Sequence, residues 1–175
     1  MEDPRKIEVI NHANDKDYIL NTVKNKETVL FIEFADESLR DDREIIFEAV
    51  KTNPLSLEFA SARLKDDKEI VLEAVSKIGW EICYASKRLC ADKQIALSAV
   101  KSDGQALYYV SKELRDDEEV VLEAVKNKGL IYKFASKRLR SNKNIAIEAI
   151  KNDKRAYSFI TDEIKEDEEI KKILE

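Results

Sequence analysis

The 175-residue chain has little glycine, proline, cysteine or histidine: three, two, two and one residues, respectively. Three glycines are too few for a set of glycine-rich phosphate loops, and two prolines exclude collagen-like or proline-rich linker material. The single histidine, His12, leaves little room for histidine-based catalysis or for a zinc site. No apolar run approaches the ~18 residues that span a bilayer, and the first residues lack the apolar core of a signal peptide. We therefore expect a cytoplasmic protein with no cofactor, metal site or membrane segment.

The cysteines and the overall charge narrow the class further. Cys83 and Cys90 are seven residues apart, which within one helix is a separation of ~10 Å along the axis. A disulfide needs Cα atoms within ~7 Å, so both residues are expected to be free thiols. The chain has 36 acidic and 31 basic residues and a net charge of −5. An acidic balance argues against a general nucleic-acid coat.

A tandem repeat accounts for most of the sequence. Similar five-residue segments recur every 25 residues and begin at Asp41, Asp66, Ala91, Asp116, Ser141 and Glu166. A first block of 27 residues starts near Asn14. The spacing predicts one domain, with an N-terminal cap over residues 1–13, six repeats over 14–165 and a C-terminal capping helix over 166–175. We call these repeats blocks, and block position 1 is the first residue of each 25-residue block.

The first half of each block has the pattern of a short helix. In Asp67–Ser76, for example, apolar residues fall at block positions 5, 6, 7, 9 and 10, which predicts a helix that is buried over much of its circumference. Asp41, Asp66 and Asp116 each precede a glutamate by three residues, which predicts a capping box at the helix start; Ala91 breaks this pattern. Position 9 is alanine in five blocks, and a small side chain there would let a neighbouring helix approach closely.

The second half of each block predicts a turn and a second helix. Gly79, Gly104 and Gly129 occupy position 14, where we expect a left-handed residue just past the end of the first helix. The second helix is expected over about Trp80–Arg88, with positions 17, 20, 21 and 24 on its buried face. Position 19 is always aromatic, which is typical of core residues between repeats. Position 21 is serine or threonine, and we expect its hydroxyl to bond a backbone carbonyl at a close helix contact.

Helices of about ten residues are marginally stable alone in water, and one block cannot bury its own apolar face. Stacked blocks bury those faces against their neighbours. The sequence therefore predicts an all-α protein: an α-solenoid of about six helix-turn-helix repeats of 25 residues, with capping helices at both ends.

One sequence pattern recurs within the chain. It covers Asp66–Val75 followed by Tyr84–Leu89, and again Asp116–Lys126 followed by Phe134–Leu139. These segments resemble a family of short tandem helical repeats known only as a domain of unknown function. The resemblance covers nearly the whole chain and implies the fold, but it implies no activity. By analogy, better-known helical-pair solenoids commonly bind proteins or nucleic acids.

The charges allow two interpretations. Cations concentrate at positions 22, 23 and 25, and acids open the next block, so both signs suit the dipoles of the helix ends and oppose each other at each junction. On this interpretation they are structural. The alternative is that the cations form a basic ridge for an acidic partner.

Recognition is expected at exposed positions that vary between blocks. Positions 15, 18 and 22 of the second helix are predicted to share one side, which in solenoids usually lines the concave surface. Aromatic and basic side chains mix there in the central blocks, and Trp and Tyr are common interface anchors. The candidate partner-binding residues are Trp80, Lys87, Tyr108, Lys112, Lys133 and Lys137.

No nucleophile with an adjacent base and no metal-ligand set is visible, so we expect no catalytic residues. The expected function is a non-catalytic scaffold that binds a protein or peptide on its concave surface. A solenoid that binds single-stranded nucleic acid and a self-assembling structural array remain the alternatives.

Overall fold

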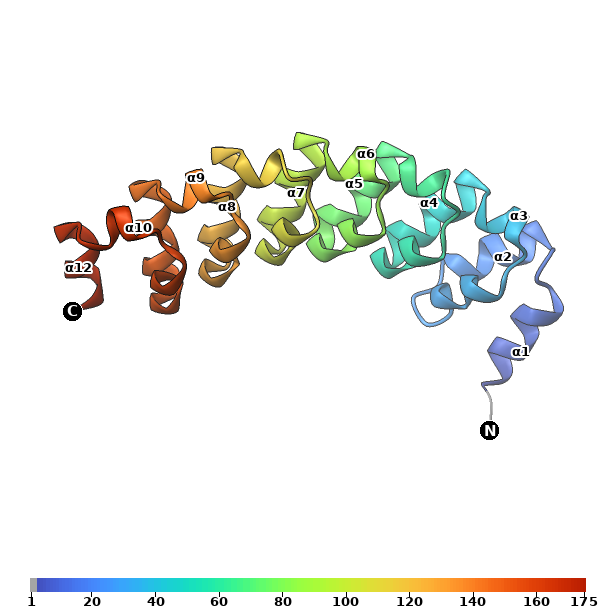
Figure 1. Cartoon of the computed structure of the whole chain (residues 1–175). Helices are drawn as coiled ribbons and strands as arrows, with labels where there is room; N and C mark the ends of the chain where they lie inside the picture. Colours follow the sequence, from blue (N-terminus) through green and yellow to red (C-terminus); the bar gives the residue numbers. More distant parts are fainter. Residues whose placement is uncertain (1–2) are drawn as a thin grey trace.

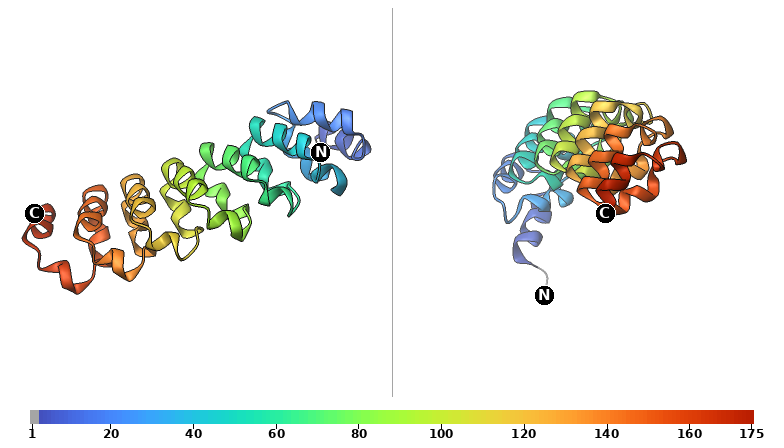
Figure 2. Two further views of the ribbon diagram at one scale, coloured as in Figure 1. Left: turned by 90° about the horizontal axis from the view of Figure 1, so that it is seen from above. Right: turned by 90° about the vertical axis from the view of Figure 1, so that its left-hand side faces the viewer.

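The computed structural model describes residues 3–175, and within this range the chain is helical, with no β-strand. The blocks stack side by side into an arc (Figure 1). Long α-helices stack on one another in one row, and 3-10 helices stack in a second row. Two further views show that the stack also twists along its length (Figure 2). The predicted all-α solenoid is confirmed.

The long helix of each block begins at block position 3 and covers ten residues. These helices are α4 (Arg43–Thr52), α5 (Lys68–Lys77), α7 (Lys93–Ser102), α8 (Glu118–Asn127) and α10 (Lys143–Asn152). The shorter α2 (Lys16–Val23) takes this place in the first block. Position 9 alanines are fully buried in all five long helices, as their small size predicts.

The helix cap lies one residue later than the sequence suggested. Asp67, at position 2, caps α5 by accepting from the backbone N–H groups of Glu69 and Ile70. Asp92 caps α7 in the same way, so the block that begins at Ala91 has an intact cap. The predicted capping box with Asp41, Asp66 and Asp116 is therefore wrong, because position 1 lies outside the helix and its carboxylate is used elsewhere.

The predicted second helix is in fact two short pieces. A 3-10 helix comes first: η1 (Val29–Phe34), η2 (Pro54–Phe59), η4 (Gly79–Tyr84), η5 (Gly104–Tyr108), η7 (Gly129–Phe134) and η8 (Lys154–Phe159). A shorter helical turn follows: α3 (Glu37–Arg40), η3 (Leu64–Asp66), α6 (Lys87–Cys90), η6 (Leu114–Asp116), α9 (Lys137–Arg140) and α11 (Asp162–Lys165).

Positions 20 and 21 separate the two pieces because their backbone is extended, at ψ 155° for Ala85 and 156° for Ser86. Ser86 is the N-cap of α6, and its hydroxyl accepts from the N–H of Leu89. The extended backbone also points the Ser86 N–H at the Lys65 carbonyl of the preceding block, at 2.9 Å. The same bond recurs in every later block, so the break in the helix ties each block to the one before it.

The position 14 glycines do not adopt the predicted left-handed conformation, because none has a positive φ. They are required by a close approach between blocks. A Cβ atom at Gly79 would lie 2.1 Å from the Ala99 carbonyl oxygen, and one at Gly129 would lie 2.4 Å from that of Ala149. Both carbonyls belong to position 9 of the next long helix, so the glycine at position 14 packs directly against the backbone of that helix.

A short helix packs on each end of the described stack. α1 (Pro4–Asn11) is capped by Asp3 and packs on η1, and α12 (Glu168–Leu174) packs on α10. Met1 and Glu2 of the predicted N-terminal cap lie outside the described residues. The position 19 aromatics border the core rather than fill it, and Tyr109 is 39% exposed. None of the helices described is long and apolar enough to cross a membrane.

Candidate partner-binding site

The short helices run along the outer edge of the arc, where they form what we call the ridge (Figure 1). Asp66 lies there beside Ser86 and Arg88 of the same block. Its carboxylate accepts from the Ser86 hydroxyl and from Arg88 Nε, and its carbonyl accepts from the other guanidinium nitrogen at 2.7 Å. Asp41 and Asp116 make the equivalent contacts. The position 21 hydroxyl thus bonds a carboxylate, and the predicted backbone carbonyl is wrong for these three blocks.

The charge of the residue at position 23 depends on the residue at position 1 of the same block. The three blocks with aspartate at position 1 have arginine at position 23, namely Arg63, Arg88 and Arg138. The two blocks with Ala91 and Ser141 have Glu113 and Glu163 instead. Because the arginine appears only where its carboxylate partner is present, these charges are part of the fold.

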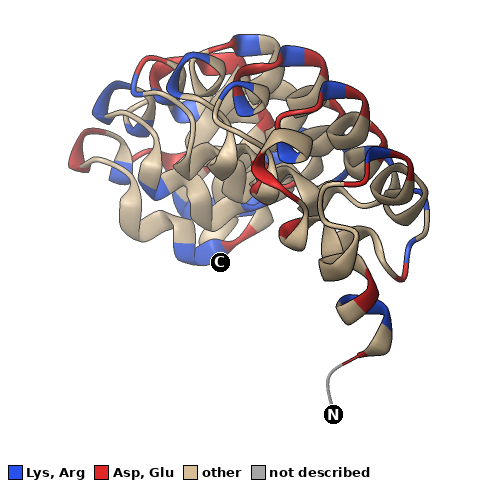
Figure 3. Ribbon diagram, turned by 90° about the vertical axis from the view of Figure 1, so that its right-hand side faces the viewer, with Lys and Arg blue, Asp and Glu red and all other residues tan. Residues whose placement is uncertain are grey.

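A second set of ion pairs joins successive long helices. Arg43, Lys68 and Lys93, at position 3, each bond the capping aspartate of the next helix, at 2.7–2.9 Å. Glu118 takes position 3 in α8, and the next cap is the neutral Asn142. Acidic and basic segments consequently alternate along the stack (Figure 3).

These pairings support the structural interpretation of most ridge charges. Lys87, Lys112 and Lys137 differ, because within residues 3–175 none of them takes part in an ion pair. They are exposed on the ridge and spaced 25 residues apart.

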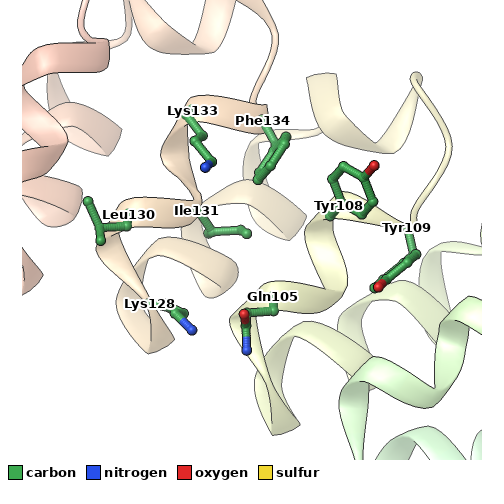
Figure 4. A pocket seen from close by; sticks show the side chains of 8 residues that line it. All are labelled: Gln105, Tyr108, Tyr109, Lys128, Leu130, Ile131, Lys133 and Phe134. Carbon is green, nitrogen blue, oxygen red and sulfur yellow. The ribbon is translucent and has the colours of Figure 1, made fainter.

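The row of 3-10 helices holds a pocket whose side chains, unlike most of the ridge charges, form no ion pairs with each other (Figure 4). It has a volume of about 410 Å³ and lies between the blocks that begin at Ala91 and Asp116. We call it the Tyr108 pocket. It is lined by Gln105, Tyr108, Tyr109, Lys128, Leu130, Ile131, Lys133 and Phe134.

Aromatic rings form one wall of the Tyr108 pocket. The Tyr108 ring lies 4.9 Å from that of Phe134 and 5.0 Å from that of Tyr109, both in edge-to-face contacts. Tyr108 is 53% exposed, the most of any large apolar residue among those described. The Lys133 ammonium lies 4.9 Å from the centre of the Phe134 ring. Rings held against one another lose little freedom on binding, so this wall is suited to an apolar or aromatic group.

The charge of the Tyr108 pocket is uncompensated. Lys128 and Lys133 carry its two charges, no acid is among its lining residues, and neither lysine forms an ion pair within the described chain. Lys128 reaches the lower rim beside Gln105, while Lys133 lies above Ile131 and beside Phe134 (Figure 4). The pocket can therefore take a group that is apolar in part and negatively charged in part.

The structure brings together only two of the six predicted site residues, Tyr108 and Lys133. Trp80 is 37% exposed and lies against Tyr84, with ring centres 6.0 Å apart, one block earlier on the same row. Lys87, Lys112 and Lys137 lie on the ridge instead. The prediction that positions 15, 18 and 22 share one side is wrong, because the extended residues at positions 20 and 21 reset the helical phase before position 22.

Lys128, Tyr109 and Phe134 line the pocket but were not candidates from the sequence. Tyr109 and Phe134 had the regular spacing of core residues, and nothing in the sequence showed that this row borders the surface. Lys128 precedes Gly129 in the turn, and the candidates were chosen only from positions on one face of the second helix.

Comparison with known proteins assigns the repeat to a family. A family model described as a domain of unknown function (DUF4116) matches residues 15–65, 67–115 and 117–170. The chain belongs to this family. No curated protein and no solved structure matches it.

Each DUF4116 match spans about 50 residues, which is two structural blocks. The residues 50 positions before the Tyr108 pocket therefore occupy its equivalent place. We call them the Glu58 junction: Leu55, Glu58, Phe59, Ile78, Trp80, Glu81, Cys83 and Tyr84.

The Glu58 junction has the opposite charge to the Tyr108 pocket. Glu58 replaces Tyr108 and is exposed, and Glu81 replaces Ile131 and is fully buried. Neither carboxylate oxygen of Glu81 has a hydrogen-bond partner among the residues described. Burial and the nearby Glu58 raise the pKa of Glu81 to about 7.

The thiols lie at and beside this junction. Both cysteines are free, as predicted, although they lie in different elements, η4 and α6. Burial, together with Glu81 and Glu58, raises the pKa of Cys83 to about 11. A thiol with a raised pKa is a poor nucleophile, so Cys83 is not suited to covalent chemistry.

Proposed function

We propose that this DUF4116 protein is a non-catalytic scaffold that binds a segment of a partner protein in the Tyr108 pocket. The observation that supports it best is the pocket's composition: exposed, mutually packed aromatic rings beside two lysines without an acidic partner. Such side chains are common anchors of protein interfaces, since they supply contact area and charge at little entropic cost.

The rest of the molecule supports a scaffold. Most ridge charges are paired within the array, and the residues described contain no group of acids, cysteines and histidine that could hold a metal ion. Gln105, Tyr108, Lys128 and Lys133 of the pocket are exposed residues at positions that vary between blocks, so they can vary without disturbing the stack. We also propose that the protein is cytoplasmic.

Single-stranded nucleic acid is the second candidate ligand, and the same pocket motivates it. Tyr108, Tyr109 and Phe134 could stack on bases while Lys128 and Lys133 meet phosphates. Binding of that kind would weaken steeply with added salt.

A pull-down from native cell lysate tests the proposal, with the wild-type chain and a Trp80→Ala/Tyr108→Ala/Lys133→Glu variant as baits. Both baits are first shown to fold by circular dichroism, and each lysate is divided into nuclease-treated and untreated halves. We expect a protein that is retained by the wild type after nuclease treatment and lost from the variant. Recovery of nucleic acid alone would replace this proposal with the second candidate, and equal recovery by both baits would exclude this surface.

A further inference from the structure

The 3-10 row changes its charge along the array. Position 18 holds Glu58, Cys83, Tyr108 and Lys133 in four consecutive blocks, and all of these except the partly buried Cys83 are exposed. The row is thus acidic at one end, neutral and aromatic in the middle, and basic at the other end. Trp80 and Leu130, at position 15, continue the apolar middle.

Neither charged end has an ion-pair partner among the described residues. The Glu58 side chain is exposed and forms no ion pair within residues 3–175. Lys65 lies nearby, but its ammonium donates to the Glu58 backbone carbonyl at 2.6 Å. The Glu58 carboxylate is hydrogen-bonded to the neutral Tyr84 hydroxyl, so its negative charge has no ion-pair partner among the described residues. At the other end, Lys128 and Lys133 have no acidic partner.

The residues at position 25 do not cancel the difference in charge between the two ends of the row. It holds Lys65 behind the Glu58 junction and Arg115 in the equivalent place behind the Tyr108 pocket. Because both are basic, they contribute similarly at the two ends. The difference between the ends therefore comes from the exposed Glu58 against the exposed Lys128 and Lys133.

We infer that the scaffold recognises an extended protein segment of mixed charge, with a basic residue at Glu58, apolar or aromatic residues across Trp80 and Tyr108, and an acidic residue at Lys133. This inference rests on the proposed function and specifies its partner. A strand of nucleic acid fits the row poorly, because its phosphates would meet Glu58 as well as Lys133. Complementary charges at two ends of one surface fix the register and direction of the bound segment.

The length of the array sets the spacing of the partner's charges. Neighbouring packed helices lie ~8–10 Å apart, so three steps from Glu58 to Lys133 cover roughly 24–30 Å. An extended chain advances about 3.3 Å per residue. The basic and acidic residues of the bound segment should therefore be about seven to nine positions apart.

Selection from a phage-displayed library of random 15-residue peptides tests this inference. The baits are the wild type, Glu58→Lys, Lys133→Glu and the double variant Glu58→Lys/Lys133→Glu, each shown to fold by circular dichroism. Lys112→Glu on the ridge is the matched control. We expect the wild type and the control to enrich peptides with a basic and an acidic residue at this spacing, in one preferred order along the chain.

The double variant should enrich the opposite order, because its surface charges are exchanged while the backbone direction of the bound segment is kept. Peptides that are acidic only, that need Lys133 and that bind Glu58→Lys equally well would overturn the mixed-charge inference and leave the proposed function standing. Peptides enriched by the wild type are also tested on a further bait, Tyr108→Ala. If no enriched peptide loses binding to that bait, both the inference and the proposed function are overturned.

Discussion

Glu81 is the residue whose surroundings suit it least. Its side chain is fully buried, both carboxylate oxygens lack a partner among the residues described, and the other blocks place small or apolar residues at this position: Ser56, Ala106, Ile131 and Ala156. A buried ionised carboxylate without a hydrogen bond is costly. Glu81 should therefore be protonated in the folded protein over a wider pH range than in the unfolded chain.

Exchange of this residue should change how stability depends on pH. The pKa of Glu81 rises from an ordinary 4.5 to about 7 on folding, so the folded state binds more protons between these values. Protonated Glu81 is compatible with the folded state, so its contribution to the free energy of unfolding is fully present below pH 4.5. This contribution is lost as the pH rises through 7 and Glu81 ionises in the buried site. We expect Glu81→Ala to raise the urea midpoint more at pH 8 than at pH 5, by up to about 3 kcal/mol in the free energy of unfolding.

Glu163→Ala, which alters an exposed acid without an ion pair in the described residues, is the control for that series. Urea unfolding followed by circular dichroism at both pH values measures the effect. An equal pH dependence in the wild type and Glu81→Ala would mean that Glu81 finds a partner in solution.

At the scale of the element, the sequence predicted the long helices well and the second helix poorly. Apolar residues at positions 5, 6, 9 and 10 recur in every long helix, and those residues are buried. The apolar stripe at positions 17, 20, 21 and 24 is compatible with one continuous helix, which is why one helix was predicted. A 3-10 helix followed by a short turn buries Ile82 and Leu89 equally well, so the stripe does not distinguish the two structures. Ser86 is a capping residue type and was the available signal for the break.

The break between the 3-10 helix and the short turn, which the sequence pattern did not predict, also explains how much of the site could be predicted. Tyr108 and Lys133 precede the break in their blocks, so a helical-face argument grouped them correctly. Lys87, Lys112 and Lys137 follow it, and their predicted direction was wrong. The pairing of Asp66 with Arg88 could not be assigned either, since it depends on which of two adjacent aspartates caps the helix.

The glycine that begins the 3-10 helix η7 gives a prediction for this element. In Gly129→Ala, the new Cβ would lie 2.4 Å from the Ala149 carbonyl oxygen, so α10 must shift. We expect a loss of about 1–3 kcal/mol in the free energy of unfolding, the usual cost of overpacking.

Lys154→Ala is the matched control for Gly129→Ala. Lys154 has the same position in the block that begins at Ser141, where a side chain is already accommodated. Thermal melts of the two variants compare the two sites directly. A Gly129→Ala melt that coincides with that of the wild type would show that the blocks pack less closely than described.

At the scale of the whole molecule, stability comes from contacts between neighbouring blocks. Each long helix packs on the next, and a backbone hydrogen bond joins each block to its predecessor. In a linear array of this kind, cooperativity depends on every interface in the series. Weakening one central interface should therefore uncouple the two halves.

Ala99→Leu is designed to weaken such an interface. Ala99 is fully buried in α7, the central long helix, and its carbonyl faces Gly79 of the preceding block. We expect the larger side chain to lower the melting temperature and to broaden the transition or split it in two, because the halves then unfold separately. Differential scanning calorimetry measures both changes. One sharp transition at the wild-type temperature would contradict the assigned packing.

The most direct test of the account is the affinity of the captured partner for two matched double variants, measured by isothermal titration calorimetry. Tyr108→Ala/Lys133→Ala alters the Tyr108 pocket, and Lys87→Ala/Lys112→Ala alters exposed residues on the ridge. Loss of a buried anchor at an interface commonly costs more than about 1.4 kcal/mol, which is tenfold in Kd. We predict at least this loss for the pocket variant and an unchanged Kd for the ridge variant. An unchanged Kd for the pocket variant, or a loss confined to the ridge variant, would contradict the assigned site.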